Sequence, residues 1–422
     1  MFRHLSPKVS LRFLGFSYTI QLFIKETTLV RKFVTKVSLI AALFSLVTAP
    51  AFAVNLVGGG ATFANPILDA CKAEYARETG DNYVYNSLGS GAGRAGIDKG
   101  DFDFGWSDTP HLGASAPKNM IHLPVVAAPV AVIYNVPGIK GNATQITLSP
   151  TTIAKIFSRQ ITKWNDPAIK ADNNRTISTP VFATERVKVM VDGQSTMQTV
   201  TKKDKDGNPI ISRYTKKRES VQFPNTEIVV VYRSDSSGTS GIFTNMLRAV
   251  AGAVWTKSGN NDFTASFPGN INDIKNLGKI QGAKGSELTT ALVAKTPGAI
   301  TYAEKDYANK TKLPVAKVLN NADIAVQPGA AGVSAFLGSA KLNDNGTLTL
   351  DYATKNPGAY LLGSTSYALV LTSYPDKAKG AAVKKLMTYI LDNCAKKFPE
   401  TEFAVIDGAL YEFNKKLIAR IN

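Results

Sequence analysis

After residue 53, short apolar runs alternate with glycine-rich and serine-rich breaks. Val54–Val57 is apolar enough for a strand, and helical spacing then extends from Pro66 to Gly80. Proline suits the first turn of a helix and glycine its end. A strand at Asn82–Asn86, a glycine-rich loop and a helix to Lys99 follow. Strand–loop–helix units in this order predict an α/β fold with a mostly parallel sheet.

The same pattern recurs later in the chain. It predicts strands at Asp103–Trp106, Val125–Asn135, Ile228–Tyr232 and Tyr367–Leu371, and helices at Thr151–Phe157, Gly241–Val250 and Lys379–Lys396. Residues 185–222 differ, because they are polar, rich in Lys and Thr, and carry Asp192-Gly193 and Asp206-Gly207. Asp-Gly between strand-like runs is typical of hairpins. We therefore expect an inserted β-hairpin arm at 185–222.

The N-terminal region has the order of a secretory signal peptide. Basic residues at Arg31–Lys36 precede an apolar run, Val37–Val47, and the small-residue tripeptide Ala51-Phe52-Ala53 follows. This order predicts export and cleavage after Ala53. The run is shorter than the roughly 20 residues of a membrane span. Residues 1–30 are explained either by a longer basic region or by a start codon misassigned ahead of Leu29 or Val30.

Length and charge extend this picture. A chain of 422 residues predicts two folded lobes after the signal is removed. The net charge of +17 includes seven basic residues and one acidic residue within 1–53, so the exported protein would carry +11. This excess favours anionic ligands. The basic residues are scattered apart from a cluster near 202–218, which argues against a nucleic-acid groove.

Two cysteines, Cys71 and Cys394, stand far apart in the sequence. An oxidising compartment would allow a disulfide between them. Two separate buried thiols are the alternative.

Three loops rich in Gly, Ser and Thr each lead into a predicted helix: Gly60–Phe63, Gly89–Gly91 and Ser236–Ser240. Helix starts offer free N–H groups and a partial positive charge to an anion. One such loop is more often an ordinary helix cap. Three of them, with Arg233 just before the third, point to an oxyanion site, since the planar guanidinium group can bind two oxygens at once.

One acidic residue, Asp108, follows the strand at 103–106. A carboxylate repels an anion unless the anion brings a proton. Monohydrogen phosphate carries a proton at neutral pH and sulfate does not, so a buried Asp108 would select against sulfate. The alternative is a solvated turn residue.

At this level of detail the sequence resembles the periplasmic phosphate-binding proteins of ABC transporters. The resemblance rests on Gly58–Phe63 with Pro66, Gly89–Gly91, Asp103–Asp108, Arg233–Ser240 and Thr296–Tyr302, in that order along the chain. It implies a two-lobed type II periplasmic binding fold that encloses a desolvated phosphate. The extra arm, Gly91 in place of a common Ser, and Ser236 in place of a common Gly depart from the pattern.

The resemblance also implies roles for individual residues. The expected phosphate ligands are Thr62, Phe63, Ser90, Asp108, Arg233, Ser237, Gly238 and Thr239, with Asp235 orienting the arginine. It further implies that the chain crosses between lobes near 127 and 330, so that lobe I comprises 54–127 and 331–422 and lobe II comprises 128–330. This division would bring Cys394 into the lobe of Cys71.

Other functions receive less support. A phosphatase would also need phosphate-cradling loops, but His111 and His122 show no metal-ligand spacing and no Gly-x-Ser-x-Gly elbow occurs. Gly91-x-Gly93-x-x-Gly96 matches a dinucleotide fingerprint only weakly. Another oxyanion, or an adhesion or signalling module that uses the arm, remains an alternative. We expect a monomeric binding protein that partners the membrane permease of an importer, with no cofactor, metal or nucleic acid.

Overall fold

The computed structural model describes residues 9–13, 16–20, 53–139, 145–191, 193–205 and 207–422. The chain divides into two compact units, Met1–Phe52 and Ala53–Asn422. In the first unit, β1 (Val9–Phe13) and β2 (Phe16–Ile20) pair in antiparallel orientation. The signal peptide expected at 31–53 lies, apart from Ala53, outside the described residues and stays a prediction.

The second unit contains the remaining elements. Its strands are β3 (Asn55–Gly60), β4 (Asn82–Ser87), β5 (Phe104–Ser107), β6 (Met120–Tyr134), β7 (Thr147–Leu148), β8 (Thr176–Phe182), β9 (Thr184–Val191), β10 (Gln194–Thr201), β11 (Ile211–Arg218), β12 (Val229–Arg233), β13 (Ile280–Ala283), β14 (Ala299–Glu304), β15 (Lys317–Leu319), β16 (Ala325–Val326), β17 (Lys341–Leu342), β18 (Leu348–Thr349) and β19 (Gly363–Leu371). Its α-helices are α2 (Asn65–Thr79), α3 (Ser90–Lys99), α4 (Pro150–Phe157), α5 (Pro167–Asn173), α6 (Gly238–Val250), α7 (Phe263–Ser266), α8 (Gly285–Lys295), α9 (Lys305–Thr311), α10 (Ala330–Leu337), α11 (Lys377–Tyr389), α12 (Ala395–Lys397) and α13 (Gly408–Ala419).

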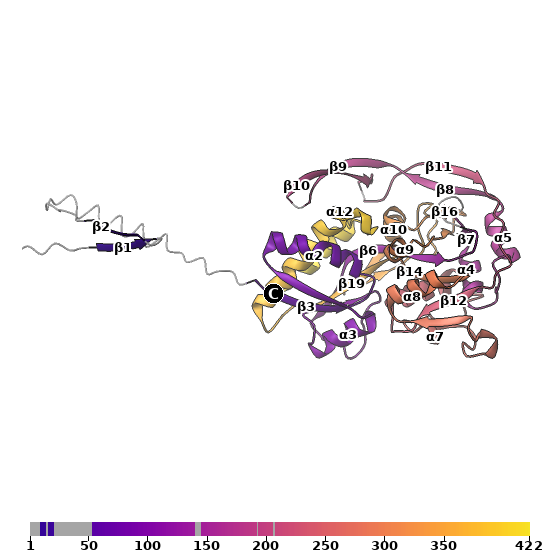
Figure 1. Cartoon of the computed structure of the whole chain (residues 1–422), viewed down its shortest axis with the longest axis horizontal. Helices are drawn as coiled ribbons and strands as arrows, with labels where there is room; N and C mark the ends of the chain where they lie inside the picture. The colour runs from indigo at the N-terminus through magenta and orange to yellow at the C-terminus, as the bar shows by residue number, and fades with distance from the viewer. Residues whose placement is uncertain (1–8, 14–15, 21–52, 140–144, 192, 206) are drawn as a thin grey trace, which may run out of the picture. The chain divides into compact units, whose positions relative to one another are not determined.

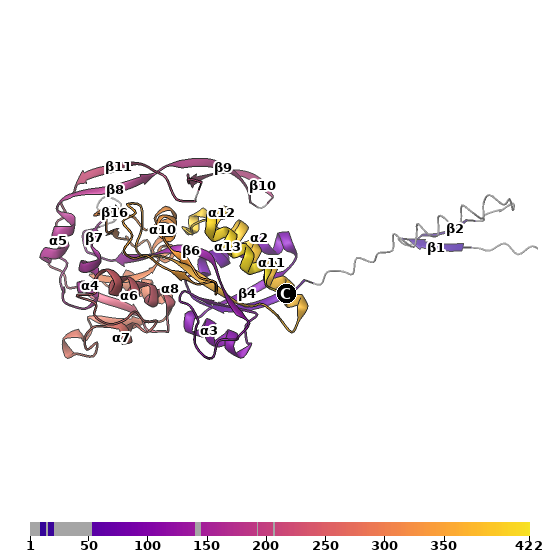
Figure 2. The same cartoon turned by 180° about the vertical axis from the view of Figure 1, so that it is seen from behind.

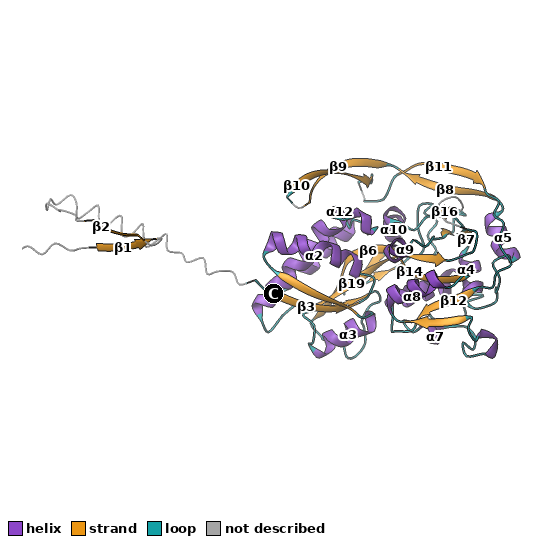
Figure 3. Ribbon diagram, viewed as in Figure 1, coloured by secondary structure: helices purple, strands orange, loops and turns teal. Residues whose placement is uncertain are grey.

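Eight strands form one mixed sheet in the order β13-β12-β14-β6-β19-β5-β3-β4. Parallel pairs lie at both ends of this order: β3 pairs with β4 and β5, and β12 pairs with β13 and β14. The long strand β6 joins the two halves. Its Met120–Pro129 part pairs with β19, and its Val130–Tyr134 part pairs with β14, both antiparallel. Helices flank the strands of both halves (Figures 1 and 3). The mostly parallel α/β halves expected from the sequence are therefore present.

Strand β6 is buried along its whole length except at Met120, because its sequence is almost continuously apolar. Strands buried on both faces have this pattern. Glycines allow α3 to pack closely on the neighbouring strands. A Cβ atom at Gly93 would lie 2.2 Å from the Trp106 carbonyl oxygen, and one at Gly96 would lie 2.2 Å from the Phe102 ring. The spacing that resembled a dinucleotide fingerprint is thus explained by close packing.

The inserted arm is a two-stranded ribbon. Strands β8 and β11 pair at its base and β9 and β10 pair further out, both antiparallel. The arm begins at Thr176, ahead of the start at 185 that the sequence suggested, because Thr176–Phe182 pairs with Ile211–Arg218. The ribbon runs above α10 and α12 in both views, whereas α3 and α7 lie on the other side of the unit (Figures 1 and 2).

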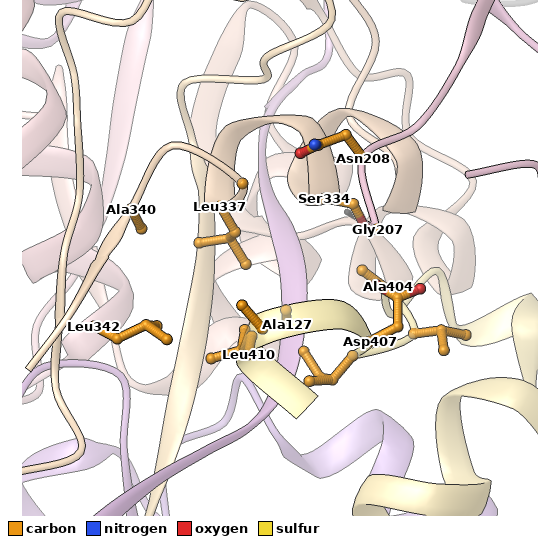
Figure 4. A pocket seen from close by; sticks show the side chains of 14 residues that line it. Ala127, Gly207, Asn208, Ser334, Leu337, Ala340, Leu342, Ala404, Asp407 and Leu410 are labelled. Carbon is orange, nitrogen blue, oxygen red and sulfur yellow. The ribbon is translucent and has the colours of Figure 1, made fainter. Parts of the chain in front are cut away.

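The arm is attached to the C-terminal part of the chain by a few polar contacts. The Lys203 Nζ atom donates to the Asp407 carboxylate at 2.6 Å and to the Val405 carbonyl oxygen at 3.1 Å. Gln198 Nε2 donates to the Lys397 carbonyl oxygen at 3.1 Å. Next to these contacts, Gly207 and Asn208 of the arm line a pocket together with Leu337 and Leu410 of the body (Figure 4). The arm therefore contacts the body through polar bonds and along the lining of this pocket.

Cys71 of α2 and Cys394 form a disulfide, with their Cα atoms 5.6 Å apart. The bond that the sequence left open is thus present in the structure. It connects the start of the folded unit to the C-terminal helical segment. Nearby, the buried Lys397 Nζ atom donates to Glu74 at 3.1 Å and to Glu78 at 2.7 Å.

Candidate functional site

Arg233 lies at the end of β12, where its side chain is 1% exposed. Asp235 holds the guanidinium group by two bonds: Nε to Oδ1 at 2.7 Å and Nη2 to Oδ2 at 2.5 Å. Asp235 also accepts from the Gly285 N–H at 3.0 Å, which fixes the carboxylate in turn. Burial opposes the charge, but the bonds to Asp235 raise the pKa of Arg233 above its usual value. The arginine is thus a fixed, fully charged group in the interior.

The remaining guanidinium nitrogen, Nη1, points to hydroxyl groups from distant segments. It donates at 2.9 Å to Thr62 Oγ1, in the loop before α2, and at 2.9 Å to Ser286 Oγ, at the start of α8. The two hydroxyls lie 3.0 Å apart. A longer contact of 3.5 Å reaches Thr239 Oγ1 in α6. Three helix starts therefore meet at one end of the arginine.

Two of the predicted loops are in direct contact. The Gly238 N–H, at the start of α6, donates to Ser90 Oγ at the start of α3 over 3.0 Å. The Asp108 N–H donates to the same oxygen at 3.2 Å. A Cβ atom at Gly238 would lie 2.5 Å from Ser90 Oγ and 2.6 Å from Asp108 Cβ, so only glycine permits this approach.

The structure places Ser237 and Phe63 differently from the hydroxyl ligands. Ser237 is the N-cap of α6: its Oγ accepts from the Ser240 N–H at 3.2 Å, and its own N–H donates to the Asn261 carbonyl oxygen at 2.9 Å. The Phe63 ring is fully buried and packs edge-on against Phe403. Any contribution of Phe63 to the site must therefore come from its backbone.

Asp108 is buried at the centre of the cluster, with a side chain only 3% exposed. Its Oδ1 accepts from Ser366 Oγ at 2.6 Å, and its Oδ2 lies 3.3 Å from both Ser90 Oγ and Thr239 Oγ1. Burial, followed by the negative charge of Glu304, raises the pKa of Asp108 to about 7, while its hydrogen bonds and Arg233 oppose the rise. The turn residue considered as the alternative would be exposed, and Asp108 is not.

Three residues of the cluster were missed in the sequence: Ser286, Glu304 and Ser366. Ser286 follows Gly285 at a helix start, the same signal that identified the other loops. Glu304 comes two residues after the Thr296–Tyr302 motif and accepts from Thr239 Oγ1 at 2.7 Å. Ser366 is a hydroxyl on the buried strand β19, and no local signal distinguishes it from a structural serine.

A cavity of about 240 Å³ lies beside this cluster, and Thr62 is the cluster side chain that lines it. Thr62, Gly285 and Tyr307 line it, together with Asn65, Ser87 and Leu88. Within the described part of the chain, no three His, Cys, Asp or Glu side chains are grouped to hold a metal ion. No described helix combines the length and the apolar character that crossing a membrane requires.

The geometry defines a class of protein: an α/β binding protein with a buried arginine, several helix starts and two buried carboxylates, Asp108 and Glu304, at a single site. Residues 47–393 match the model of the PBP superfamily domain. Phosphate-binding protein PstS 3 of Mycobacterium leprae is 30% identical over 73% of this chain and 70% of that protein. Phosphate-binding protein PstS of Pasteurella multocida is 29% identical over 72% of each. The chain belongs to the PBP superfamily and, within it, to the family of PstS phosphate-binding proteins.

Solved structures agree with this fold. A high-affinity periplasmic phosphate-binding protein, PfluDING, is 20% identical, with 87% of this chain and 93% of that chain covered and a TM-score of 0.59. A phosphate-binding protein from Stenotrophomonas maltophilia is 18% identical over 87% and 93%, with a TM-score of 0.57. At these identities the likeness shows the two-lobed fold.

Proposed function

We propose that the protein is exported to the periplasm, binds inorganic phosphate in the cleft between its two lobes, and delivers it to the permease of an ABC importer. The observation that carries the proposal is the junction of Arg233, Asp108 and the start of α6 in one buried cluster. The relatives named as phosphate-binding proteins support the choice of ligand.

The proposed ligands are those expected from the sequence, joined by Ser286. Phosphate oxygens would take the hydrogen bonds that these groups now make with one another. Arg233 Nη1, for example, would turn from the Thr62 and Ser286 hydroxyls to a phosphate oxygen, and those hydroxyls would donate to it as well. A charge-assisted bond to a doubly charged anion is stronger than a bond between arginine and neutral hydroxyls.

Asp108 would accept the proton of monohydrogen phosphate. Its other oxygen is already held by Ser366 Oγ at 2.6 Å, so the acceptor is fixed in place before the ligand arrives. Sulfate has no proton to offer and would leave the carboxylate oxygen facing an anionic oxygen. Burial makes that repulsion costly, because water cannot screen it.

Capture would proceed by closure of the lobes, divided near residues 127 and 330. Thr62, Ser90 and Asp108 belong to the proposed first lobe, and Arg233, Gly238 and Thr239 belong to the second. Ligand stabilises the closed form, because only there do donors from both lobes reach it together. We propose a monomer that acts as a binding protein and catalyses no reaction.

Calorimetric titration of the purified protein with phosphate, arsenate and sulfate at neutral pH tests the proposal. We expect phosphate and arsenate to bind and sulfate to give no measurable heat. Absence of phosphate binding in protein freed of bound anion by unfolding and refolding would overturn it. Release of phosphate from a phosphate ester by the wild type would instead support the phosphatase alternative.

A further inference from the structure

Glu304 is a second buried carboxylate at the same site. It ends β14 and is 1% exposed. Although it stands at the N-cap position of α9, its side chain does not cap that helix. Its Oε1 accepts from Thr239 Oγ1 at 2.7 Å, and its Oε2 is buried without a hydrogen-bond partner among the described residues. A buried carboxyl oxygen without a partner is costly, and it points to a function for this residue.

The Thr239 hydroxyl serves both carboxylates. It lies 2.7 Å from Glu304 Oε1 and 3.3 Å from Asp108 Oδ2. A hydroxyl has a single proton, so it can donate to one acceptor at a time. While Glu304 is ionised and accepts the hydrogen bond from Thr239, the Thr239 hydroxyl has no hydrogen left to donate to an anion.

Arg233 attracts Glu304, but Glu304 forms no ion pair of its own among the described residues. Arg233 is already paired with Asp235, and Asp108 is a second acid. The neutral hydroxyl groups of Thr239 and Tyr307 also face Glu304. Lys305, its neighbour in the chain, is bound to Glu402 at 2.7 Å. On the other side of the cluster, the half-buried Arg94 guanidinium group attracts Asp108. A phosphate dianion entering here would add two negative charges to three carboxylates, Asp108, Asp235 and Glu304, which Arg233 and Arg94 compensate only in part.

We propose that Glu304 is a positioning residue of the phosphate site, which takes up a proton as phosphate binds and so frees the Thr239 hydroxyl to donate to the anion. The proton comes from solvent and bonds to Glu304 Oε1. Oε1 then donates to Thr239 Oγ1, and the Thr239 proton turns to a phosphate oxygen. The proton on phosphate itself remains directed to Asp108. This inference rests on the proposed function.

The test compares phosphate affinity between about pH 8 and 9.5 in the wild type and in Glu304→Gln, whose amide can donate to Thr239 without a proton from solvent. Across this range free phosphate stays in its monohydrogen form. One linked proton makes the wild-type affinity fall about tenfold for each pH unit. The Glu304→Gln affinity should fall less steeply, so that the variant binds more tightly than the wild type at the alkaline end.

Three further variants test whether Glu304 acts on phosphate through Thr239 or only supports the fold. Glu402→Gln removes a carboxylate near the site that does not contact Thr239, and should leave the wild-type slope unchanged. In a Thr239→Val background the effect of Glu304→Gln on the slope should shrink to the part that comes from charge repulsion alone, whereas in Thr239→Ser, which retains the hydroxyl, the full effect should remain. Parallel affinity curves for wild type and Glu304→Gln would overturn the inference.

A measurement on the wild type covers the case in which Glu304→Gln does not fold. Titration at about pH 8.5 in two buffers of different ionisation enthalpy counts the protons taken up with phosphate. About one proton is expected, and none would overturn the inference while leaving phosphate binding intact. A wild type that binds no phosphate at any pH would instead refute the proposed function.

Discussion

The buried site and the arm both carry concentrated polar and charged groups, but they hold them in opposite ways. Arg233 is 1% exposed, and each of its guanidinium nitrogens donates to a fixed acceptor. In the arm, every residue of β11 from Ser212 to Arg218 is exposed. The attachment of Lys203 to Asp407 is a contact between partly exposed side chains. Charge is expensive to bury, so only the site needs a complete set of partners.

This difference separates two uses of basic residues in one chain. In the site, removing one group leaves another buried and unpaired, so each substitution should act strongly and specifically. In the arm, water replaces whatever a substitution removes. The same number of charges should therefore contribute far less there to ligand affinity and to stability.

The largest effect is expected from Arg233→Ala. This variant removes the cation from the proposed site and leaves Asp235 buried beside it. Breaking a buried pair costs about 3–5 kcal/mol, so phosphate affinity should fall by at least a hundredfold in calorimetry. Arg248→Ala, at an exposed position of α6, is the matched control and should bind as the wild type does. If Arg233→Ala and the control bound phosphate equally tightly, Arg233 would not be a phosphate ligand.

The next effect concerns Asp108 and the pH dependence of stability. Its folded-state pKa is raised from 3.8 to about 7, so the folded protein holds a proton that the unfolded chain releases. This contribution to stability is complete below about pH 4 and is lost as the pH rises through 7. A shift of roughly three units corresponds to about 4 kcal/mol.

Chemical denaturation of the phosphate-free protein at pH 4 to 8 checks this. Because an asparagine side chain in place of Asp108 is neutral at every pH, the Asp108→Asn variant should gain stability relative to the wild type as the pH rises. Other carboxylates with lowered pKa values act in both proteins and cancel in the difference. A constant difference across the range would show that Asp108 is not held in a raised-pKa state.

The effect of Asp108→Asn on the preference for phosphate over sulfate should be smaller. An Asn amide can donate to an anionic oxygen, so Asp108→Asn should admit sulfate. The preference for phosphate over sulfate should fall by about tenfold or more, the effect of one unpaired buried acceptor. Competition of both anions for the same protein measures the ratio. An unchanged preference would place selectivity elsewhere in the cluster.

The sequence predicted the loops of the site better than its interior. Thr62, Ser90 and Gly238 could be predicted because a glycine-rich helix start can be recognised from a few consecutive residues. Glu304 and Ser366 approach Thr239 and Asp108 only through the sheet order, in which β14 and β19 flank β6. Their contacts depend on pairings between segments far apart in the chain, and no local pattern encodes such pairings. The arm's base was missed for the same reason, because β8 is defined by its pairing with β11.

The smallest effect is expected from Lys203→Ala, which detaches the arm from Asp407. The ion pair is partly exposed, and such pairs contribute about 0–1 kcal/mol. The midpoint of thermal unfolding should therefore shift by a few degrees at most, and phosphate affinity should stay within about twofold of the wild type.

Proteolysis of the arm in Lys203→Ala should nevertheless accelerate. The variant also loses the bond to the Val405 carbonyl oxygen and, of the contacts described above, keeps only that of Gln198. If Lys203→Ala instead weakened phosphate binding as much as Arg233→Ala, the arm would have to control lobe closure, and the separation between the two regions would fail.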